Sequence, residues 1–323
     1  MGFKTRGMLP LVACLLCIAG PGLEARTGPD LRLLDAVVAQ DKAAVQTLLK
    51  ERPNVNAARA DGVTALLYAA HLNNLEIVDL LVRAGASVNA PDDHGVTPLA
   101  RACENANLAV VDRLLGAGAH PNVAQTSGLT PLMIAARTGN AQVIKALLAH
   151  GANANAATAQ TRDTALMWAL AGQHPDVARL LLDAGANVRA STAKGMTPLL
   201  IAARNGDIEM AKALMARGVG VNETGTDGTH PLPFAIVNAQ AAFAEFLLDQ
   251  GASPNGSMGG VSALHAATAG AVELWLADWS LKQGEGARSG RSLTPDERGT
   301  LVKTLLGRGA DPNARTTTQA VFM

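Results

Sequence analysis

The side chains that most often carry catalysis or bind metals are sparse in this chain and are not grouped. The 323 residues include 7 histidines and 3 cysteines, and the histidines occur one at a time. No His-Glu-x-x-His zinc motif, phosphate-binding Gly-rich loop ending in Lys-Ser/Thr, or Gly-x-Ser-x-Gly nucleophile turn is present. The sequence therefore predicts a protein that is not an enzyme, with no catalytic residue, no metal site and no cofactor.

Composition excludes several further classes. Basic and acidic residues balance at 27 each, so the chain lacks the overall positive charge typical of proteins that bind nucleic acid or an anionic membrane. Two of the three cysteines, Cys14 and Cys17, lie close to the N-terminus, which argues against a disulfide-stapled fold. Hydrophobic residues make up 48% of the chain but aromatic residues only 3%, so we expect a core of Ala, Leu and Val.

The N-terminus has the pattern of a bacterial-type export signal. Lys4 and Arg6 precede an apolar run over residues 8–20, which is too short to span a bilayer but suits the core of a signal peptide. Ala25 fits the small residue at a cleavage position. We therefore predict a signal peptide over residues 1–25, export to the periplasm or out of the cell, and no membrane span in the mature chain.

A lipid anchor is the alternative at this end of the chain. The segment 11–13, Leu-Val-Ala, precedes Cys14 as in a lipobox, which would attach lipid to that cysteine. The apolar run continues past Cys14, whereas in a lipoprotein signal it should end there. The cleaved signal peptide is therefore the preferred interpretation.

A repeat of about 33 residues organises the rest of the chain. Gly-Ala or Gly-Val pairs recur at spacings of 33, 33, 34, 33, 33 and 58 residues, beginning at Gly85, Gly118, Gly151, Gly185, Gly218, Gly251 and Gly309. Paired apolar residues such as Leu147-Leu148 precede each glycine, and Thr-Pro-Leu or a variant of it opens most units. A period of this length predicts structural units that stack side by side.

The landmarks within a unit predict a helix, a short loop, a second helix and a long loop. A Thr hydroxyl caps the free amides at a helix start, and Pro fits the first turn because it has no N–H to leave unpaired. An Ala-Ala step such as Ala135-Ala136 keeps one helix face thin, so that neighbouring helices approach closely. Gly85 and its counterparts end the second helix in the left-handed conformation.

On these residues the sequence resembles the ankyrin repeat family over roughly residues 30–315. The resemblance implies an all-α solenoid over 26–315, built of stacked helix-loop-helix units with β-turn or hairpin-like loops. The predicted units are about 30–60, 61–94, 95–127, 128–161, 162–194, 195–227, 228–259 and 260–315. Such a stack needs no division into separate globular domains, because its core grows in one dimension.

Three units depart from the pattern, among them the unit 228–259, whose first helix lacks the Ala-Ala step. Arg162 stands where several other units have glycine, so the turn there must differ. The last unit, with a spacing of 58 instead of 33, contains 25 extra residues placed at about 271–294. Its second helix is predicted to begin at Thr294, which with Glu297 forms a capping box. Residues 316–323 form a tail, interpreted as the start of a truncated repeat or as a cover for the last unit.

Candidate binding residues follow from the resemblance, which implies that first helices and loop tips line one concave face. The position just before the Ala-Ala step holds Tyr68, Arg101, Ile134, Trp168, Ile201 and Phe234. Aromatic and Arg side chains are frequent anchors of protein interfaces. The predicted partner-binding residues are Tyr68, Arg101, Trp168, Phe234, His94 at a loop tip, and Trp275 and Trp279 on one face of a helix in the last unit. The alternative is that the aromatic residues pack inside the stack.

Other polar residues have structural explanations. His265 matches the histidine of the family's Thr-Pro-Leu-His motif, which implies a structural hydrogen bond. Cys103 replaces an alanine on the thin helix face and is predicted to be buried and inert. Asparagines recur after the glycine, at Asn89, Asn122, Asn155, Asn222, Asn255 and Asn313. We expect their side chains to bond to the loop backbone.

The resemblance implies a monomeric scaffold that binds another protein through its concave face, without catalysis and without nucleic acid. One alternative is that the repeats are the noncatalytic arm of a larger enzyme or redox protein whose active part would follow Met323. A weaker alternative is a secreted effector directed at a host cell. The partner itself is not indicated by any residue.

Overall fold

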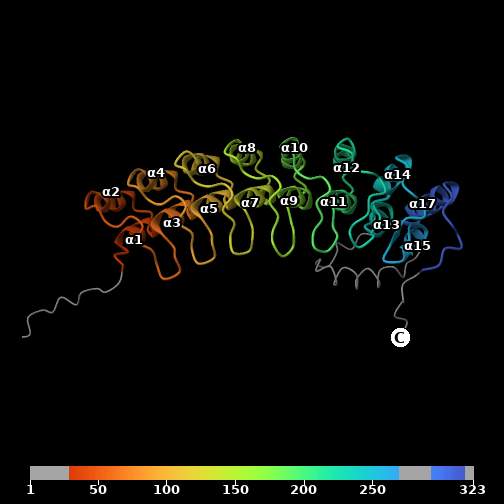
Figure 1. Ribbon diagram of the computed structural model, residues 1–323, viewed down its shortest axis with the longest axis horizontal. Helices are drawn as coiled ribbons and strands as arrows, with labels where there is room; N and C mark the ends of the chain where they lie inside the picture. The colour runs from red at the N-terminus through yellow and green to blue at the C-terminus, as the bar shows by residue number, and fades with distance from the viewer. Residues whose placement is uncertain (1–28, 269–291, 317–323) are drawn as a thin grey trace, which may run out of the picture.

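The computed structural model describes residues 29–268 and 292–316, which form a row of helix pairs (Figure 1). The first helices of the pairs are α1 (Arg32–Val38), α3 (Ala65–His71), α5 (Pro98–Glu104), α7 (Pro131–Thr138), α9 (Ala165–Ala171), α11 (Pro198–Asn205), α13 (Pro231–Val237) and α15 (Ala263–Thr268). The second helices are α2 (Lys42–Lys50), α4 (Leu75–Arg83), α6 (Leu108–Leu115), α8 (Ala141–Ala149), α10 (Pro175–Asp183), α12 (Ile208–Met215), α14 (Ala241–Asp249) and α17 (Pro295–Gly307). The predicted all-α repeat solenoid is confirmed.

The pairs stack so that first helices contact first helices, from α1 through α15. The row is curved, with the second helices along its outer side and the first helices and long loops toward its inner side (Figure 1). In the described residues, strand pairing is confined to the loops. It consists of β1 (Ser257–Met258) antiparallel to β2 (Val261–Ser262) and isolated bridges in two other loops. We call the long loops 58–64, 91–97, 124–130, 157–164, 191–197, 224–230 and 256–262 the finger loops.

Helix starts follow the local chemistry that the sequence predicts. The Thr97 hydroxyl accepts a hydrogen bond from the backbone N–H of Ala100 at 3.2 Å, and Pro98 occupies the first turn. Thr294 and Glu297 form the predicted capping box at the start of α17. His230 opens α13 without a side-chain cap, but its ring nitrogen Nδ1 lies 2.9 Å from the Ser257 carbonyl oxygen in the next finger loop.

The core has the expected composition of Ala, Leu and Val and is continuous along the row. Ala135 and Ala136 are 0% exposed, in the closely spaced layer of first helices. Leu147 on α8 is also 0% exposed, whereas Leu148 beside it is half-buried. Each unit therefore covers an apolar face of its neighbour, and burial of one such leucine contributes about 1.5–3 kcal/mol before entropy is subtracted.

The turn at Arg162 differs from the others in length but not in handedness. Arg162 has φ 59, in the same left-handed region as Gly95 with φ 73. The Gly95 N–H donates to the carbonyl three residues earlier, at Asp92, whereas the Arg162 N–H donates to the carbonyl four residues earlier, at Thr158. The extra residue of this unit is therefore absorbed in its finger loop, and the helices on either side keep their positions in the row.

The recurring asparagines join each unit to the next. The Asn122 side chain donates to the Gly151 carbonyl at 2.9 Å and accepts from the Asn153 N–H at 2.8 Å. The same two bonds are made by Asn89, Asn155, Asn222 and Asn255. The prediction that these side chains bond to the loop backbone is confirmed for these residues, and the bonded backbone belongs to the following unit.

At one junction, Arg189 stands in place of this asparagine and acts together with Glu223 of the following unit. Arg189 donates to the Gly218 carbonyl, as the Asn Nδ2 does elsewhere, while Glu223 accepts from the Gly220 N–H at 2.9 Å. Arg189 and Glu223 also form an ion pair at 2.9 Å. The hydrogen bond from Arg189 holds the pKa of the Glu223 carboxyl below its usual range.

Replacing Asn122 with alanine should lower the free energy of unfolding by about 1–3 kcal/mol, because two hydrogen bonds between units are lost. Urea unfolding followed by circular dichroism measures the change. Asn313→Ala is the matched control, because the Asn313 side chain occupies the same repeat position but bonds to no described residue. Equal stabilities of the two variants would contradict a coupling role for the asparagines.

Candidate binding face

The six residues at the position before the Ala-Ala step divide into two groups. Tyr68, Arg101 and Trp168 are half-buried, so each side chain retains an accessible edge. The other three are core residues, with exposed fractions of 1% for Ile134, 4% for Ile201 and 1% for Phe234. Phe234 therefore packs inside the stack, as the alternative interpretation of the aromatic residues expects, and does not contribute to an accessible face. Trp275 and Trp279 lie outside the described residues, as do the signal peptide, most of the predicted insertion and all but the first residue of the tail.

Tyr68 lies on α3 between two partly exposed side chains. The Arg59 guanidinium carbon, from the preceding finger loop, is 5.8 Å from the centre of the Tyr68 ring. The His71 ring packs edge-on against Tyr68, with ring centres 5.8 Å apart. A cation over a ring and an edge-on contact both restrict the orientation of the phenol, so Tyr68 offers a pre-ordered contact surface.

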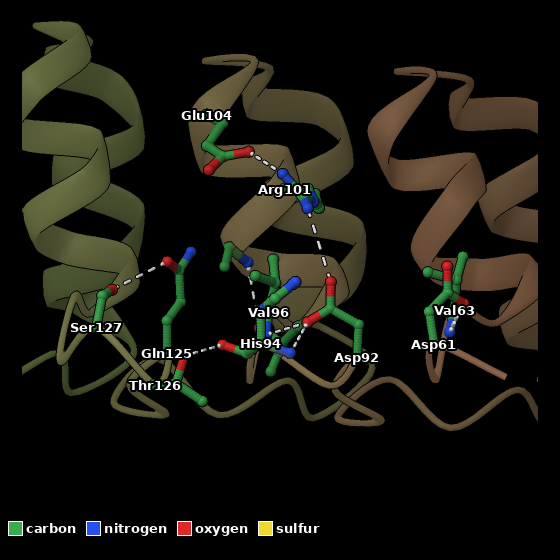
Figure 2. Close-up of polar contacts among 12 residues, drawn as sticks. Asp61, Val63, Asp92, His94, Val96, Arg101, Glu104, Gln125, Thr126 and Ser127 are labelled. Atoms are coloured by element: carbon green, nitrogen blue, oxygen red, sulfur yellow. Dashed lines mark hydrogen bonds and ion pairs between the residues drawn. The ribbon is translucent and has the colours of Figure 1, made fainter. Parts of the chain in front are cut away.

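Arg101 is held between two carboxylates (Figure 2). Its guanidinium is 2.8 Å from the Glu104 carboxylate on the same helix and 3.7 Å from that of Asp92 in the finger loop. Asp92 is 8% exposed, and its Oδ1 also accepts from the backbone N–H groups of His94 at 2.9 Å and Val96 at 2.8 Å. The charge of Arg101 is therefore compensated inside the chain, and its role includes bracing the finger loop.

His94 is exposed at the tip of its finger loop, as expected. Its carbonyl accepts from the backbone N–H of Thr126 at 2.9 Å and from the Thr126 hydroxyl at 3.0 Å (Figure 2). The backbone of this tip is therefore hydrogen-bonded to the next finger loop. Among the described residues, the His94 imidazole belongs to no group of His, Cys, Asp and Glu side chains that could hold a metal ion.

Trp168 on α9 has the least satisfied environment of the predicted residues. Its indole Nε1 is buried and has no hydrogen-bond partner in the described chain. The Arg137 guanidinium carbon, from α7 in the preceding unit, is 5.8 Å from the centre of the indole ring. Because buried polar groups normally have a partner, this N–H distinguishes Trp168 from the aromatic residues of the core.

Sequence analysis did not single out Arg59 or Arg137 as members of this face. Arg137 lies three residues after Ile134, so the helical period places it on the same face as the column of candidate residues. That spacing was a usable signal for Arg137. The position of Arg59 over Tyr68 depends on the path of the finger loop, which helical periodicity does not describe.

The predicted structural residues behave as expected. The ring of His265 lies with its Nδ1 2.7 Å from the Ser262 hydroxyl in the same unit. Cys103 is 0% exposed, and its burial raises the pKa of the thiol far above its usual range. Both residues therefore belong to the framework of the repeats and not to an accessible site.

The described residues show no grouping suited to a metal ion and no spanning helix. Over 29–268 and 292–316, no three His, Cys, Asp or Glu side chains gather where they could hold a metal. None of the helices in these segments combines the length and the apolar character needed to cross a membrane. The accessible features of the inner side are thus aromatic rings, guanidinium groups and loop tips.

Stacked helix pairs with projecting finger loops define a repeat protein of the protein-interaction class. A family model described as "Ankyrin repeats (3 copies)" matches residues 33–125, 101–192 and 185–258. These matches together cover more than half of the chain, and the chain belongs to the ankyrin repeat family. A comparison with curated proteins finds no match. Ankyrin repeats are generally modules for protein interaction and are typically non-catalytic.

Proposed function

We propose that this protein is a scaffold without catalysis of its own, which binds another protein through the inner side of its curved row. The observation that carries the proposal is the set of half-buried Tyr68, Arg101 and Trp168 on the first helices α3, α5 and α9, at a position where other units bury an apolar residue. Ordered aromatic and Arg side chains on a rigid framework lose little entropy on binding, which suits them as interface anchors.

The test compares capture of a partner by wild type and by the double variant Tyr68→Ala/Trp168→Ala. Removing an interface anchor costs about 2 kcal/mol or more, so capture should weaken by about thirtyfold or more. The matched control is Phe246→Ala, which removes a half-buried aromatic ring from the outer helix α14. Capture should survive in the control, and circular dichroism checks that both variants are folded. Equal capture by a folded double variant would contradict the proposal.

We also propose that the protein acts after export and removal of residues 1–25. The support is the order of basic residues, short apolar run and small residues at the N-terminus. N-terminal sequencing of protein recovered from the periplasm or medium should begin at Arg26. Intact residues 1–25 on protein that remains in the cytoplasm would contradict export.

A further inference from the structure

Charge is unevenly distributed along the inner side of the row. On α1, α3, α5 and the finger loops 58–64 and 91–97, acidic side chains outnumber basic ones: Arg32, Asp35, Arg59, Asp61, Asp92, Asp93, Arg101 and Glu104. On α7, α9, α11 and the finger loops 124–130, 157–164 and 191–197, basic side chains outnumber acidic ones: Arg137, Arg162, Asp163, Lys194 and Arg204. We call the second stretch the basic stretch. It includes Trp168 and its unpartnered indole N–H.

The charges of Arg137 and Arg162 are not compensated in the way that the charge of Arg101 is. Arg101 lies between two carboxylates, whereas neither Arg137 nor Arg162 forms an ion pair with a described residue. Asp163 is the nearest acid along the chain to Arg162, and its carboxylate accepts from the Thr161 hydroxyl at 2.6 Å. Two exposed guanidinium groups of the basic stretch are therefore available to a negatively charged ligand.

Arg137 is placed to act together with Trp168. Its backbone carbonyl lies 3.1 Å from the His174 ring, which ties the end of α7 to the next unit. Its guanidinium lies over the Trp168 ring, and contact with a ring face leaves the N–H groups of Arg free to donate. Since the indole N–H is covered, an acceptor reaches it only when a neighbouring side chain moves. Arg137 is an exposed side chain that neighbours the ring.

We propose that the basic stretch binds an acidic segment of the partner protein, with a carboxylate paired to Arg137 and an oxygen acceptor reaching the Trp168 N–H. This rests on the proposed function and specifies its partner. A carboxylate of the segment matches the fork of the Arg137 guanidinium. When Arg137 moves toward that carboxylate, a second oxygen of the segment can reach the indole N–H of Trp168 and accept its hydrogen bond. The acidic stretch from α1 to α5 repels the same segment, which fixes where along the row it lies.

The same division of charge favours a protein segment over a nucleic acid. A nucleic acid carries negative charge at every nucleotide, so a strand longer than the basic stretch would run onto the exposed carboxylates of Asp61 and Asp93. A polypeptide confines its negative charge to a few residues and carries neutral or basic residues beyond them. The inner side therefore complements a chain of mixed sign and not a uniform polyanion.

The test measures binding of fluorescent peptides to the full-length protein at low salt. The probes are three unstructured peptides of one length. Every second residue is Glu in the first peptide, Gln in the second and Lys in the third, with Gly and Ser between. The Glu peptide should bind at least about tenfold more tightly than the Gln peptide and should weaken as salt is added, since salt screens exposed charge. Arg137→Gln should weaken Glu-peptide binding about fivefold to tenfold, and Trp168→Phe, which keeps an aromatic ring but removes the indole N–H and its five-membered ring, about threefold.

The matched control is Arg179→Gln, which removes an exposed guanidinium from the outer helix α10 and should leave peptide binding unchanged. Equal binding of the Glu and Gln peptides, or an Arg137→Gln variant that binds as wild type does, would overturn the inference. So would a single-stranded DNA oligonucleotide that binds more tightly than the Glu peptide and depends equally on Arg137. Suppose that the double variant at Tyr68 and Trp168 loses partner capture, but the wild-type protein binds the Glu and Gln peptides equally well. This inference then fails, and the proposed function stands.

Discussion

Leu147→Asp should divide the row into two parts that no longer unfold together. Leu147 lies on α8 near the middle of the row and is 0% exposed. The substitution removes about 1.5–3 kcal/mol of leucine burial and places a carboxylate among apolar neighbours, so the total loss should exceed about 4 kcal/mol. Because each unit is stabilised by its neighbours, we expect urea unfolding to change from one transition to two.

The matched control is Lys145→Asp, which places the same carboxylate on an exposed position of α8. It should unfold in one transition at nearly the urea concentration of the wild type, because exposed substitutions seldom change stability by more than about 0.5 kcal/mol. Hydrogen exchange assigns each transition to the units on one side of α8. A Leu147→Asp protein that unfolds like the Lys145→Asp control would show that the units are not coupled through this core.

Gly95→Ala should cost about 2–4 kcal/mol, because two effects act at one position. Gly95 has φ 73, a conformation that disfavours a side chain. A Cβ atom here would lie 3.0 Å from the backbone nitrogen of Thr126 in the next finger loop. That nitrogen donates to the His94 carbonyl, so a shift that relieves the contact also strains the bond between the two loops. Thermal or urea unfolding gives the measurement.

Gly85→Ala separates the two effects. Gly85 has φ 85, yet apart from Gly85 itself and its two chain neighbours, a Cβ atom there would have no atom of the described residues within 4 Å. It should therefore cost only the backbone term of about 1–2 kcal/mol. If both variants lose the same stability, then close approach between finger loops contributes nothing, and the loops are joined less tightly than the structure indicates.

The fold was predictable from sequence because each of its determinants is local and repeated. A Thr cap, a Pro in the first turn, an Ala-Ala step and a glycine end define one unit, and the 33-residue period shows that units recur. The role of Asn122 was half predicted. Its bonding to a loop backbone follows from its position, but its partners lie in the next unit. Local chemistry predicts each unit well, whereas contacts between units depend on the stack.

The binding face was less predictable for the same reason. Phe234 and Trp168 hold the same position in the repeat, yet one is 1% exposed and the other is half-buried. The exposed fraction of a side chain at this repeat position depends on the side chains of the adjacent units. The spacing of residues within one unit does not predict those contacts. The missing partner of the Trp168 N–H is likewise a property of its surroundings in three dimensions. Helical spacing was sufficient only for Arg137, which lies one turn beyond the predicted column.

The most direct test of partner binding through the inner side is photo-crosslinking from single positions of the full chain. A photoreactive amino acid is placed at Ala171 on the inner helix α9, and in a second protein at Arg179 on the outer helix α10. Both residues are exposed, so both probes are accommodated without disturbing the core. We predict a discrete crosslinked partner from position 171 and none from position 179. A crosslinked partner from position 179 alone would contradict the account.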